Sequence, residues 1–240
     1  MFNKSLRYSV AAQKHARYRV LRVAITLLFL FLLFNVIHTF LFSVWVIQGD
    51  SMQPGLQRGD RLLVFSSALP SLFTRIRGRT IPYNRGNIVI IDRSRATGRN
   101  PFMLAADSFV RFFTAQRVSI LDGGENLHAK RIIGIPGDEV SMVNFVMRVR
   151  PADSAFDFTE FELARRPYYP TIPHVPALWD MSLPFSGNMD GIVLGPGESF
   201  VMSDDRGSTS DSRSWGPIDT RTIIGRPIFR FWPPTRIGFP

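Results

Sequence analysis

Residues 130–149 read KRIIGIPGDEVSMVNFVMRV, in which two apolar runs, 130–135 and 139–149, stand on either side of Pro136-Gly137. Proline presets φ at one central position of a tight turn and glycine accepts positive φ at the next, so this pair predicts a turn between two strands. Similar short runs recur between Gly and Pro residues along the chain, and no 3.6-residue apolar period is long enough to predict a soluble helix. The chain beyond residue 47 is therefore expected to be mainly β.

The further runs that predict strands are residues 61–65, 87–92, 191–194, 199–202 and 223–232. Two longer stretches do not fit the pattern of short strands and are expected to be insertions. One covers about residues 93–128 and contains an aromatic patch at 109–113, and the other covers about residues 150–190 and is rich in proline. The basic stretch 66–82 is a shorter interruption.

Residues 23–47 form a run of 25 residues without Asp, Glu, Lys or Arg. A helix rises ~1.5 Å per residue, so a helix of this length crosses a ~30 Å hydrocarbon core. The alternative is a cleavable signal peptide, but its apolar region is usually ~7–15 residues long and ends at small residues. The exit of this run, VWVIQ at 44–48, has no small-x-small pattern. We expect one transmembrane anchor over residues 23–47.

The formal net charge of +10, from 29 basic and 19 acidic residues, first suggests a nucleic-acid partner. However, residues 1–22 hold six basic residues and no acidic one, so the other 218 residues carry 23 basic against 19 acidic groups. Basic residues mark the cytoplasmic side of a membrane span. Residues 1–22 are therefore expected to be a cytoplasmic tail that meets anionic lipid, residues 48–240 an extracytoplasmic domain, and nucleic acid is not expected as a partner.

Lys130 is the only lysine beyond this tail, because 26 of the 29 basic residues are Arg. A lysine amine that is buried among apolar groups can lose its proton and act as a base, which an arginine cannot do. The ordinary alternative is a lysine on a strand edge whose ammonium reaches solvent. The sequence has no Cys, which excludes disulfides, thiol nucleophiles and Cys-ligated metal sites, so catalysis would need an oxygen nucleophile.

Ser51 lies in GDSMQPGL, residues 49–56, four positions after the apolar run. A serine that caps a turn is the simple interpretation. There is no GxSxG motif, and of the four histidines only His128 and His174 lie outside the tail and the apolar run, so a Ser/His/acid triad has few partners. If the domain is a hydrolase, a pair of Ser51 and Lys130 fits better.

Four blocks of the sequence together resemble the type I signal peptidase family, the bacterial leader peptidases. They are GDSMQPGL with RGDRLLV at 49–64, RGNIVIID at 85–92, KRIIGIPGDEV at 130–140 and GESFVMSDDRGSTSDSRSWGPI at 197–218. The resemblance implies a serine endopeptidase with an antiparallel β-sheet catalytic domain, tethered in the bacterial cytoplasmic membrane by one N-terminal transmembrane helix. It would remove signal peptides from exported preproteins after an Ala-x-Ala-like motif, without a metal or an organic cofactor.

The resemblance also assigns roles to single residues. Ser51 would be the nucleophile and Lys130 the general base, and Arg131 would support the site. Further supporting roles fall on Asp211 and Arg213, for which a plain surface ion pair is the alternative. The hydroxyl that orients the base falls on Thr209 by spacing, with Ser210 as the alternative. The pockets for small substrate side chains would be lined by Ile47, Met52, Leu56, His128 and Ala129.

Two departures from the family pattern bear on activity. Gly49 stands where many members have a serine that donates to the oxyanion, and Asp205 replaces the usual Asn of the late block. These departures favour an alternative, a catalytically impaired, membrane-tethered binding protein with the fold of a signal peptidase. A cytosolic Ser/Lys self-cleaving repressor would share the dyad, but the apolar run argues against it.

The implied partners are signal-peptide-bearing preproteins and membrane lipid. The protein translocation machinery is a further partner that the sequence leaves open, since Asn35 and His38 are polar residues within the apolar run.

Overall fold

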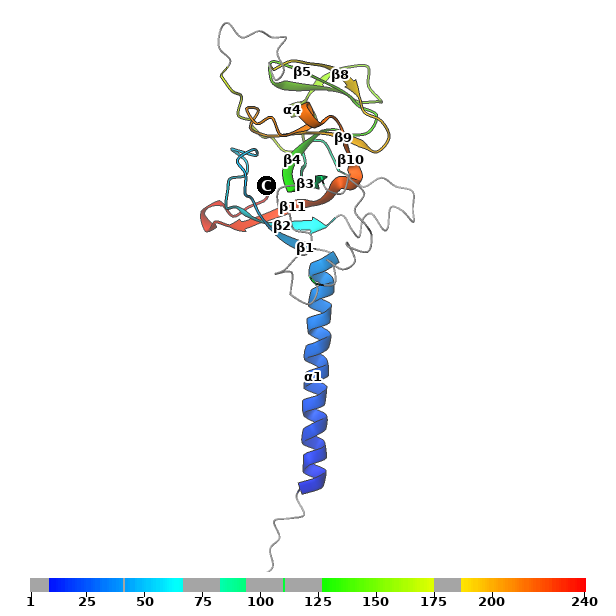
Figure 1. Cartoon of the computed structure of the whole chain (residues 1–240), viewed down its shortest axis with the longest axis vertical. Coiled ribbons are helices and arrows are strands. Elements are labelled where there is room, and N and C mark those ends of the chain that lie inside the picture. The colour runs from blue at the N-terminus through cyan, green and yellow to red at the C-terminus, as the bar shows by residue number, and fades with distance from the viewer. Residues whose placement is uncertain (1–8, 41, 67–82, 94–109, 111–126, 175–186) are drawn as a thin grey trace, which may run out of the picture.

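The computed structural model describes residues 9–40, 42–66, 83–93, 110, 127–174 and 187–240. A long N-terminal helix leads into a domain that consists mainly of strands (Figure 1). The helices are α1 (Ser9–Phe40), α4 (Glu160–Leu163), α5 (Ser212–Trp215) and the 3₁₀ helices η3 (Thr220–Thr222) and η4 (Pro234–Arg236). The strands are β1 (Phe42–Val46), β2 (Arg61–Ser66), β3 (Ile88–Asp92), β4 (Leu127–Gly134), β5 (Glu139–Val143), β6 (Val146–Arg150), β7 (Phe158–Thr159), β8 (Met189–Val193), β9 (Glu198–Met202), β10 (Ile218–Asp219) and β11 (Ile223–Trp232).

The strands form a seven-stranded sheet in the order β1-β2-β11-β3-β4-β9-β10 and a four-stranded sheet in the order β7-β6-β5-β8. Every pairing between these strands is antiparallel. In Figure 1 the small sheet lies on the side of the domain away from α1, and β1 and β2 lie nearest to the helix. The prediction of a mainly β, antiparallel fold is confirmed.

The turn predicted at Pro136-Gly137 separates β4 from β5, and Gly137 has a φ of +91°, which favours glycine. The run 139–149 differs from the expectation of one strand. Asn144 and Phe145 also have positive φ, at 51° and 65°, and the chain reverses there. Two consecutive positive φ values are the geometry of a tight hairpin turn, so the run forms the hairpin β5–β6.

The apolar run 23–47 also differs in part from the expectation. The helix ends at Phe40, and Phe42–Val46 form β1, which pairs along its whole length with β2. An apolar strand and the end of an apolar helix have the same composition, so periodicity does not separate them. Within the described residues, no helix combines the length and the apolar character that a bilayer crossing requires.

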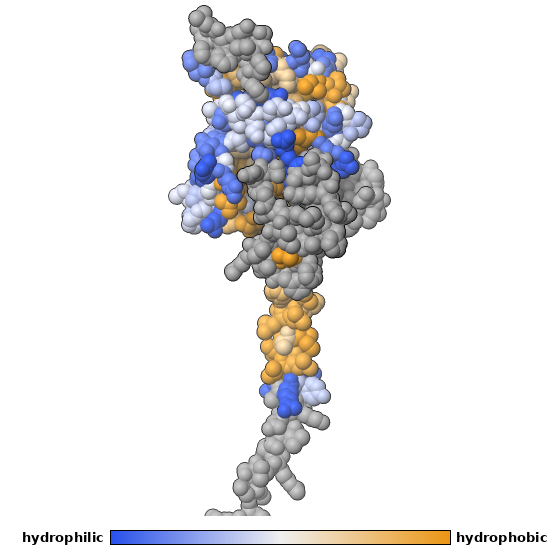
Figure 2. Space-filling model, in the orientation of Figure 1, coloured by the Kyte–Doolittle hydropathy of each residue, from blue (hydrophilic) through white to orange (hydrophobic). Residues whose placement is uncertain are grey.

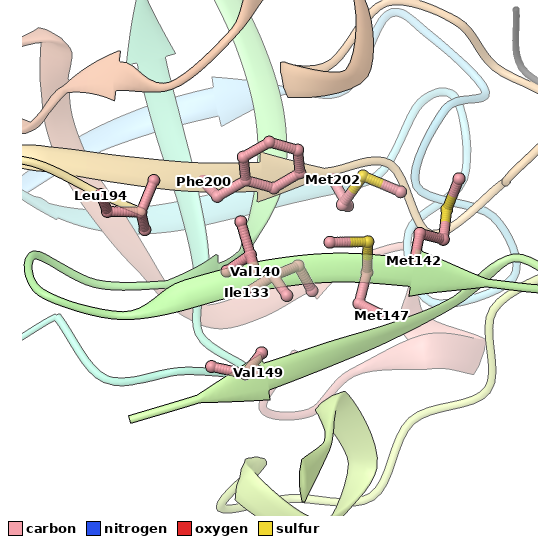
Figure 3. Packing of buried hydrophobic residues seen from close by; sticks show 8 residues of the cluster. All are labelled: Ile133, Val140, Met142, Met147, Val149, Leu194, Phe200 and Met202. Carbon is pink, nitrogen blue, oxygen red and sulfur yellow. The ribbon is translucent and has the colours of Figure 1, made fainter. Parts of the chain in front are cut away.

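The large sheet has a core on each side because side chains alternate between its two faces. In β3, Ile88 and Ile90 pack with the segment between β1 and β2 and with β2 itself. Val89 and Ile91 pack with Ile132 on the other side of the sheet. A third cluster joins β4 and β9 to the small sheet (Figure 3). It consists of Ile133, Val140, Met142, Met147, Val149, Leu194, Phe200 and Met202.

The two expected insertions are described to different extents. Most of 93–128, with its aromatic patch, lies outside the described residues. The described part of 150–190 contains α4 and β7, and β7 adds a fourth strand to the small sheet by pairing with β6. This segment is therefore part of the domain's structure.

Candidate active site

Ser51 lies in the turn region that connects β1 to β2. Two backbone hydrogen bonds join the two ends of this region. The N–H of Ile47 donates to the carbonyl of Asp60 at 2.9 Å, and the N–H of Gly59 donates to the carbonyl of Ile47 at 2.8 Å. The N–H of Leu56 donates to the carbonyl of Met52 at 2.8 Å. These bonds hold a half-buried Ser51 side chain on a defined turn.

Lys130 lies in β4, and only 1% of it is exposed. Its Nζ is 2.9 Å from Oγ of Ser51 and 5.8 Å from the ring centroid of Trp215. The alternative of an ammonium that reaches solvent is therefore wrong for this lysine. The structure brings together the two residues that the sequence singled out as nucleophile and base.

Burial lowers the pKa of the Lys130 amine from 10.5 to about 8, because the charged form loses its hydration. The carboxylate of Asp211 opposes this decrease, the positive charge of Arg213 adds to it, and Asp204 and Asp205 oppose it further. The result is an amine whose neutral form is accessible near neutral pH.

The second hydroxyl at Lys130 belongs to Ser203, whose Oγ also lies 2.9 Å from Nζ. Strand register explains this contact. Arg131 is opposite Met202 and Ile132 is opposite Val201, so the next position places Ser203 opposite Lys130, where side chains on neighbouring strands meet. Sequence spacing assigned this contact to Thr209 or Ser210, but both are exposed, and the carbonyl of Thr209 accepts a hydrogen bond from Ser214 instead.

Asp211 and Arg213 form a buried ion pair, with 2.9 Å from Nε to Oδ1 and 2.8 Å from Nη2 to Oδ2. The alternative of a surface ion pair is wrong, since the side chains are 0% and 4% exposed. Arg213 also donates to the carbonyls of Arg206 and Ser208. It therefore ties together the loop that follows β9.

Asp211 links this pair to Ser203. Its Oδ2 accepts from the backbone N–H of Ser203 at 3.1 Å, and its side chain caps α5 by accepting from the N–H of Arg213. Burial alone would raise the pKa of Asp211, but the hydrogen bonds and charge of Arg213 outweigh it and hold the pKa below the usual 3.8. Asp211 is an ionised anchor for the residue that touches Lys130.

Arg131 points to the same loop from β4. Its guanidinium forms a bidentate pair with the buried Asp204, at 2.7 and 2.6 Å, and donates to the carbonyl of Gly86 at 2.6 Å. The N–H of Asp205 in turn donates to the carbonyl of Ser51 at 3.0 Å. The loop after β9 thus contacts Ser51 and Lys130 by separate groups.

Four of the five predicted pocket residues lie in one cluster, namely Ile47, Met52, Leu56 and Ala129. His128 does not join them. Alternate residues of a strand face opposite sides, so His128 shares the face of Lys130 and lies against Trp215, with 5.2 Å between ring centroids. Burial, the charge of Lys130 and that of Arg93 lower its pKa from 6.5 to about 4, which keeps it neutral near pH 7.

A half-buried hydroxyl beside a buried, deprotonatable amine can act as a nucleophile with its own base. Within the described residues, no three His, Cys, Asp or Glu side chains are grouped in a way that could hold a metal ion. The sequence did not single out Ser203, although its position directly after a strand that pairs with β4 was a usable signal.

Comparison with known proteins gives a family match over nearly the whole chain. Residues 20–232 match the family model described as signal peptidase, peptidase S26. Signal peptidase IB of Staphylococcus aureus (strain Mu50 / ATCC 700699) is 23% identical over 214 residues, which are 89% of this chain and 88% of that protein. Thylakoidal processing peptidase 1, chloroplastic, of Arabidopsis thaliana is 39% identical over 55 residues, 23% of this chain and 16% of that protein.

Proposed function

Because this chain belongs to the signal peptidase family, peptidase S26, we propose that it is a serine endopeptidase that removes N-terminal signal peptides from exported preproteins. Cleavage would follow a small-x-small motif such as Ala-x-Ala. The observation that carries the proposal is the 2.9 Å between Oγ of Ser51 and Nζ of the buried Lys130.

In the proposed reaction, the neutral amine of Lys130 takes the proton of the Ser51 hydroxyl while Oγ attacks the scissile carbonyl carbon. The substrate C–N bond breaks, the leaving amine receives the proton from Lys130, and the signal peptide remains joined to Ser51 as an ester. A water molecule then gives a proton to Lys130 and attacks the ester carbonyl carbon. The C–O bond to Ser51 breaks, Lys130 returns the proton to Oγ of Ser51, and the signal peptide leaves with a free carboxyl group.

The protonation state of Lys130 supports this role. A pKa of about 8 leaves roughly one amine in ten neutral at pH 7, whereas the ordinary value of 10.5 would leave only about one in three thousand. The contact with Ser203 also supports this role, because it orients the lone pair of the neutral Lys130 amine. A neutral amine has two N–H groups and one lone pair, so an N–H donated to Ser203 leaves the lone pair for Ser51.

For the substrate pockets we assign Ile47, Met52, Leu56 and Ala129. They form one apolar cluster next to the nucleophile turn, and Met52 follows Ser51 directly in the chain. An apolar wall of this kind suits small side chains such as alanine and gives no partner to charged ones. The place of His128 on the opposite face of β4 speaks against a role for it in the same pocket.

We also propose that the apolar part of α1, residues 23–40, attaches the protein to the membrane, with residues 1–22 in the cytoplasm and the β domain outside. Figure 2 shows an apolar belt on the visible face of α1, with hydrophilic residues toward its N-terminal end. A helix that is apolar on all sides and exposed needs an apolar environment. The exposed residues are Val20, Leu21, Val23, Ile25, Leu27, Leu28, Phe29, Leu30, Phe31, Leu32 and Leu33.

The test uses the full-length protein in liposomes or detergent with a preprotein that carries an Ala-x-Ala site. Mass spectrometry of the products should show one cut after the second Ala, and Ser51→Ala should abolish it. Ser154→Ala, which removes a hydroxyl after β6, is the matched control and should cut normally. If the wild-type protein binds the preprotein but never cuts it, the impaired binding protein is the better description.

A further inference from the structure

Residues 160–171, here called the buttress, lie in the stretch between β6 and β8 and contact residues 203–206, here called the site loop. We propose that the buttress is a positioning element that holds the site loop against Ser51 and Lys130. The proposal rests on the proposed peptidase function, which gives the site loop its catalytic importance.

Backbone hydrogen bonds form the first connection. The N–H of Thr171 donates to the carbonyl of Asp204 at 2.9 Å, and the N–H of Arg206 donates to the carbonyl of Thr171 at 2.8 Å. The residue between them, Asp205, is the one whose N–H donates to the carbonyl of Ser51 at 3.0 Å. The buttress thus holds the two neighbours of the residue that contacts the nucleophile.

A buried ion pair forms the second connection. Nη2 of Arg206 lies 2.5 Å from Oε2 of Glu160, and both side chains are almost completely buried. Glu160 begins α4, and its other oxygen accepts from the N–H of Met147 in β6 at 3.1 Å. Through Glu160, the small sheet therefore holds the last residue of the site loop.

This ion pair is poorly explained as a stabilising contact. Buried ion pairs often contribute no net stability, because the loss of hydration offsets the attraction between the charges. Nε and Nη1 of Arg206 are also buried, without a hydrogen-bond partner among the described residues, and unsatisfied buried donors cost free energy. The pair does fix the position of Arg206, whose carbonyl accepts a hydrogen bond from Nη1 of Arg213 at 2.9 Å.

Tyr168 contacts both Glu160 and Arg131. Its hydroxyl donates to Oε2 of Glu160 at 2.5 Å, and the guanidinium carbon of Arg131 lies 3.8 Å from its ring centroid. Burial, together with the Glu160 carboxylate, raises the pKa of the Tyr168 phenol, which therefore remains a neutral donor. Arg131 binds Asp204, and Glu160 binds Arg206. Tyr168 therefore contacts the side chains that hold both ends of the segment 204–206.

The test compares Tyr168→Leu with Tyr169→Leu. The two tyrosines are adjacent, but Tyr169 is 80% exposed, which makes it a matched control. We expect Tyr168→Leu to lower kcat for preprotein cleavage roughly 10- to 100-fold, the scale of a small misplacement of catalytic groups, and Tyr169→Leu to change it less than about twofold. Tyr168→Phe keeps the ring on Arg131 and should fall between them.

Amide hydrogen exchange separates positioning from general destabilisation. In Tyr168→Leu the amides of Asp205 and Arg206 should exchange faster, while those of Val140 and Val149 in the small sheet should not change. Unchanged kcat together with unchanged exchange would overturn the proposal, as would faster exchange throughout the small sheet. If the wild-type protein cuts no preprotein, the proposed function fails, and the exchange comparison alone then decides the role of the buttress.

Discussion

Nζ of Lys130 lies 2.9 Å from Oγ of Ser51, although 79 positions separate the two residues in the chain. The lysine projects from the middle of β4, whose neighbours on both sides are strands, whereas the serine lies on a turn after the edge strand β1. Lys130, the proposed base, is therefore held by the sheet, and Ser51, the proposed nucleophile, is held next to it by contacts of the turn region.

The first prediction concerns the identity of the base. Lys130→Arg keeps the positive charge but cannot supply a neutral amine at any physiological pH. We expect preprotein cleavage to fall below detection while the circular dichroism spectrum stays that of the wild type. A normal cleavage rate in this variant would exclude Lys130 as the base.

The second prediction concerns the pH dependence of the rate. Only the neutral form of Lys130 can accept the serine proton, and its pKa is lowered to about 8. The rate should therefore increase with pH and level off above about pH 8, in initial rates measured from pH 6 to 10. A rate that is already level at pH 6 would instead indicate a base such as His128, whose pKa is about 4.

The third prediction concerns stability. Below pH 8 the folded protein holds a buried ammonium, so Lys130→Met should raise the unfolding free energy at pH 7, by at most about 3 kcal/mol for a shift of this size. Between pH 8 and 10.5 the unfolded chain binds the proton that the folded protein has lost, so the stability of the wild type rises with pH. The advantage of the variant should therefore shrink over this window in urea unfolding.

The fourth prediction separates two candidate hydroxyls. Ser203→Ala removes the acceptor beside Lys130 and should lower kcat roughly 10- to 100-fold with little change in KM. Thr209→Ala removes an exposed hydroxyl a few residues farther along the chain and should leave kcat unchanged. The opposite pattern in steady-state kinetics would return the orienting role to Thr209.

The fifth prediction concerns the oxyanion. Within the part of the chain that the structure describes, no atom lies within 4 Å of a Cβ added at Gly49, so a serine fits there. Since a single oxyanion donor can change kcat about 100-fold or more, we expect Gly49→Ser to raise kcat roughly tenfold. Gly49→Ala, which adds the Cβ without the hydroxyl, should give no gain. Equal rates for both variants would show that the hydroxyl does not reach the oxyanion.

The sequence predicted most of the longer strands because Gly or Pro residues lie close to many of them, and because β-branched side chains dominate runs such as β3, but it did not predict the two-residue strands β7 and β10. It did not separate β1 from the end of the helix, since both belong to the run 23–47, which has no charged residue. The strand can be recognised only by its partner β2, which follows after a turn region. This pairing is a tertiary property that local composition does not contain.

At the site, the choice of Ser51 and Lys130 followed from residue types and motifs, but their distance depended on the fold. The position of His128 was predictable in principle, because alternation along β4 places it with Lys130 and opposite Ala129. Ser203 required the register between β4 and β9, which no local pattern specifies. Counting along the loop led to Thr209 because it ignored this register.

The short passage from α1 to β1 has a consequence for the choice of cleavage sites. Only one residue separates the end of the helix at Phe40 from β1, and Ser51 follows five positions after that strand ends. A strand of five residues spans roughly 17 Å. Under the proposed membrane attachment, this short connection limits the distance of Ser51 from the lipid surface. A preprotein would then be selected partly by the reach of its cleavage site from the bilayer.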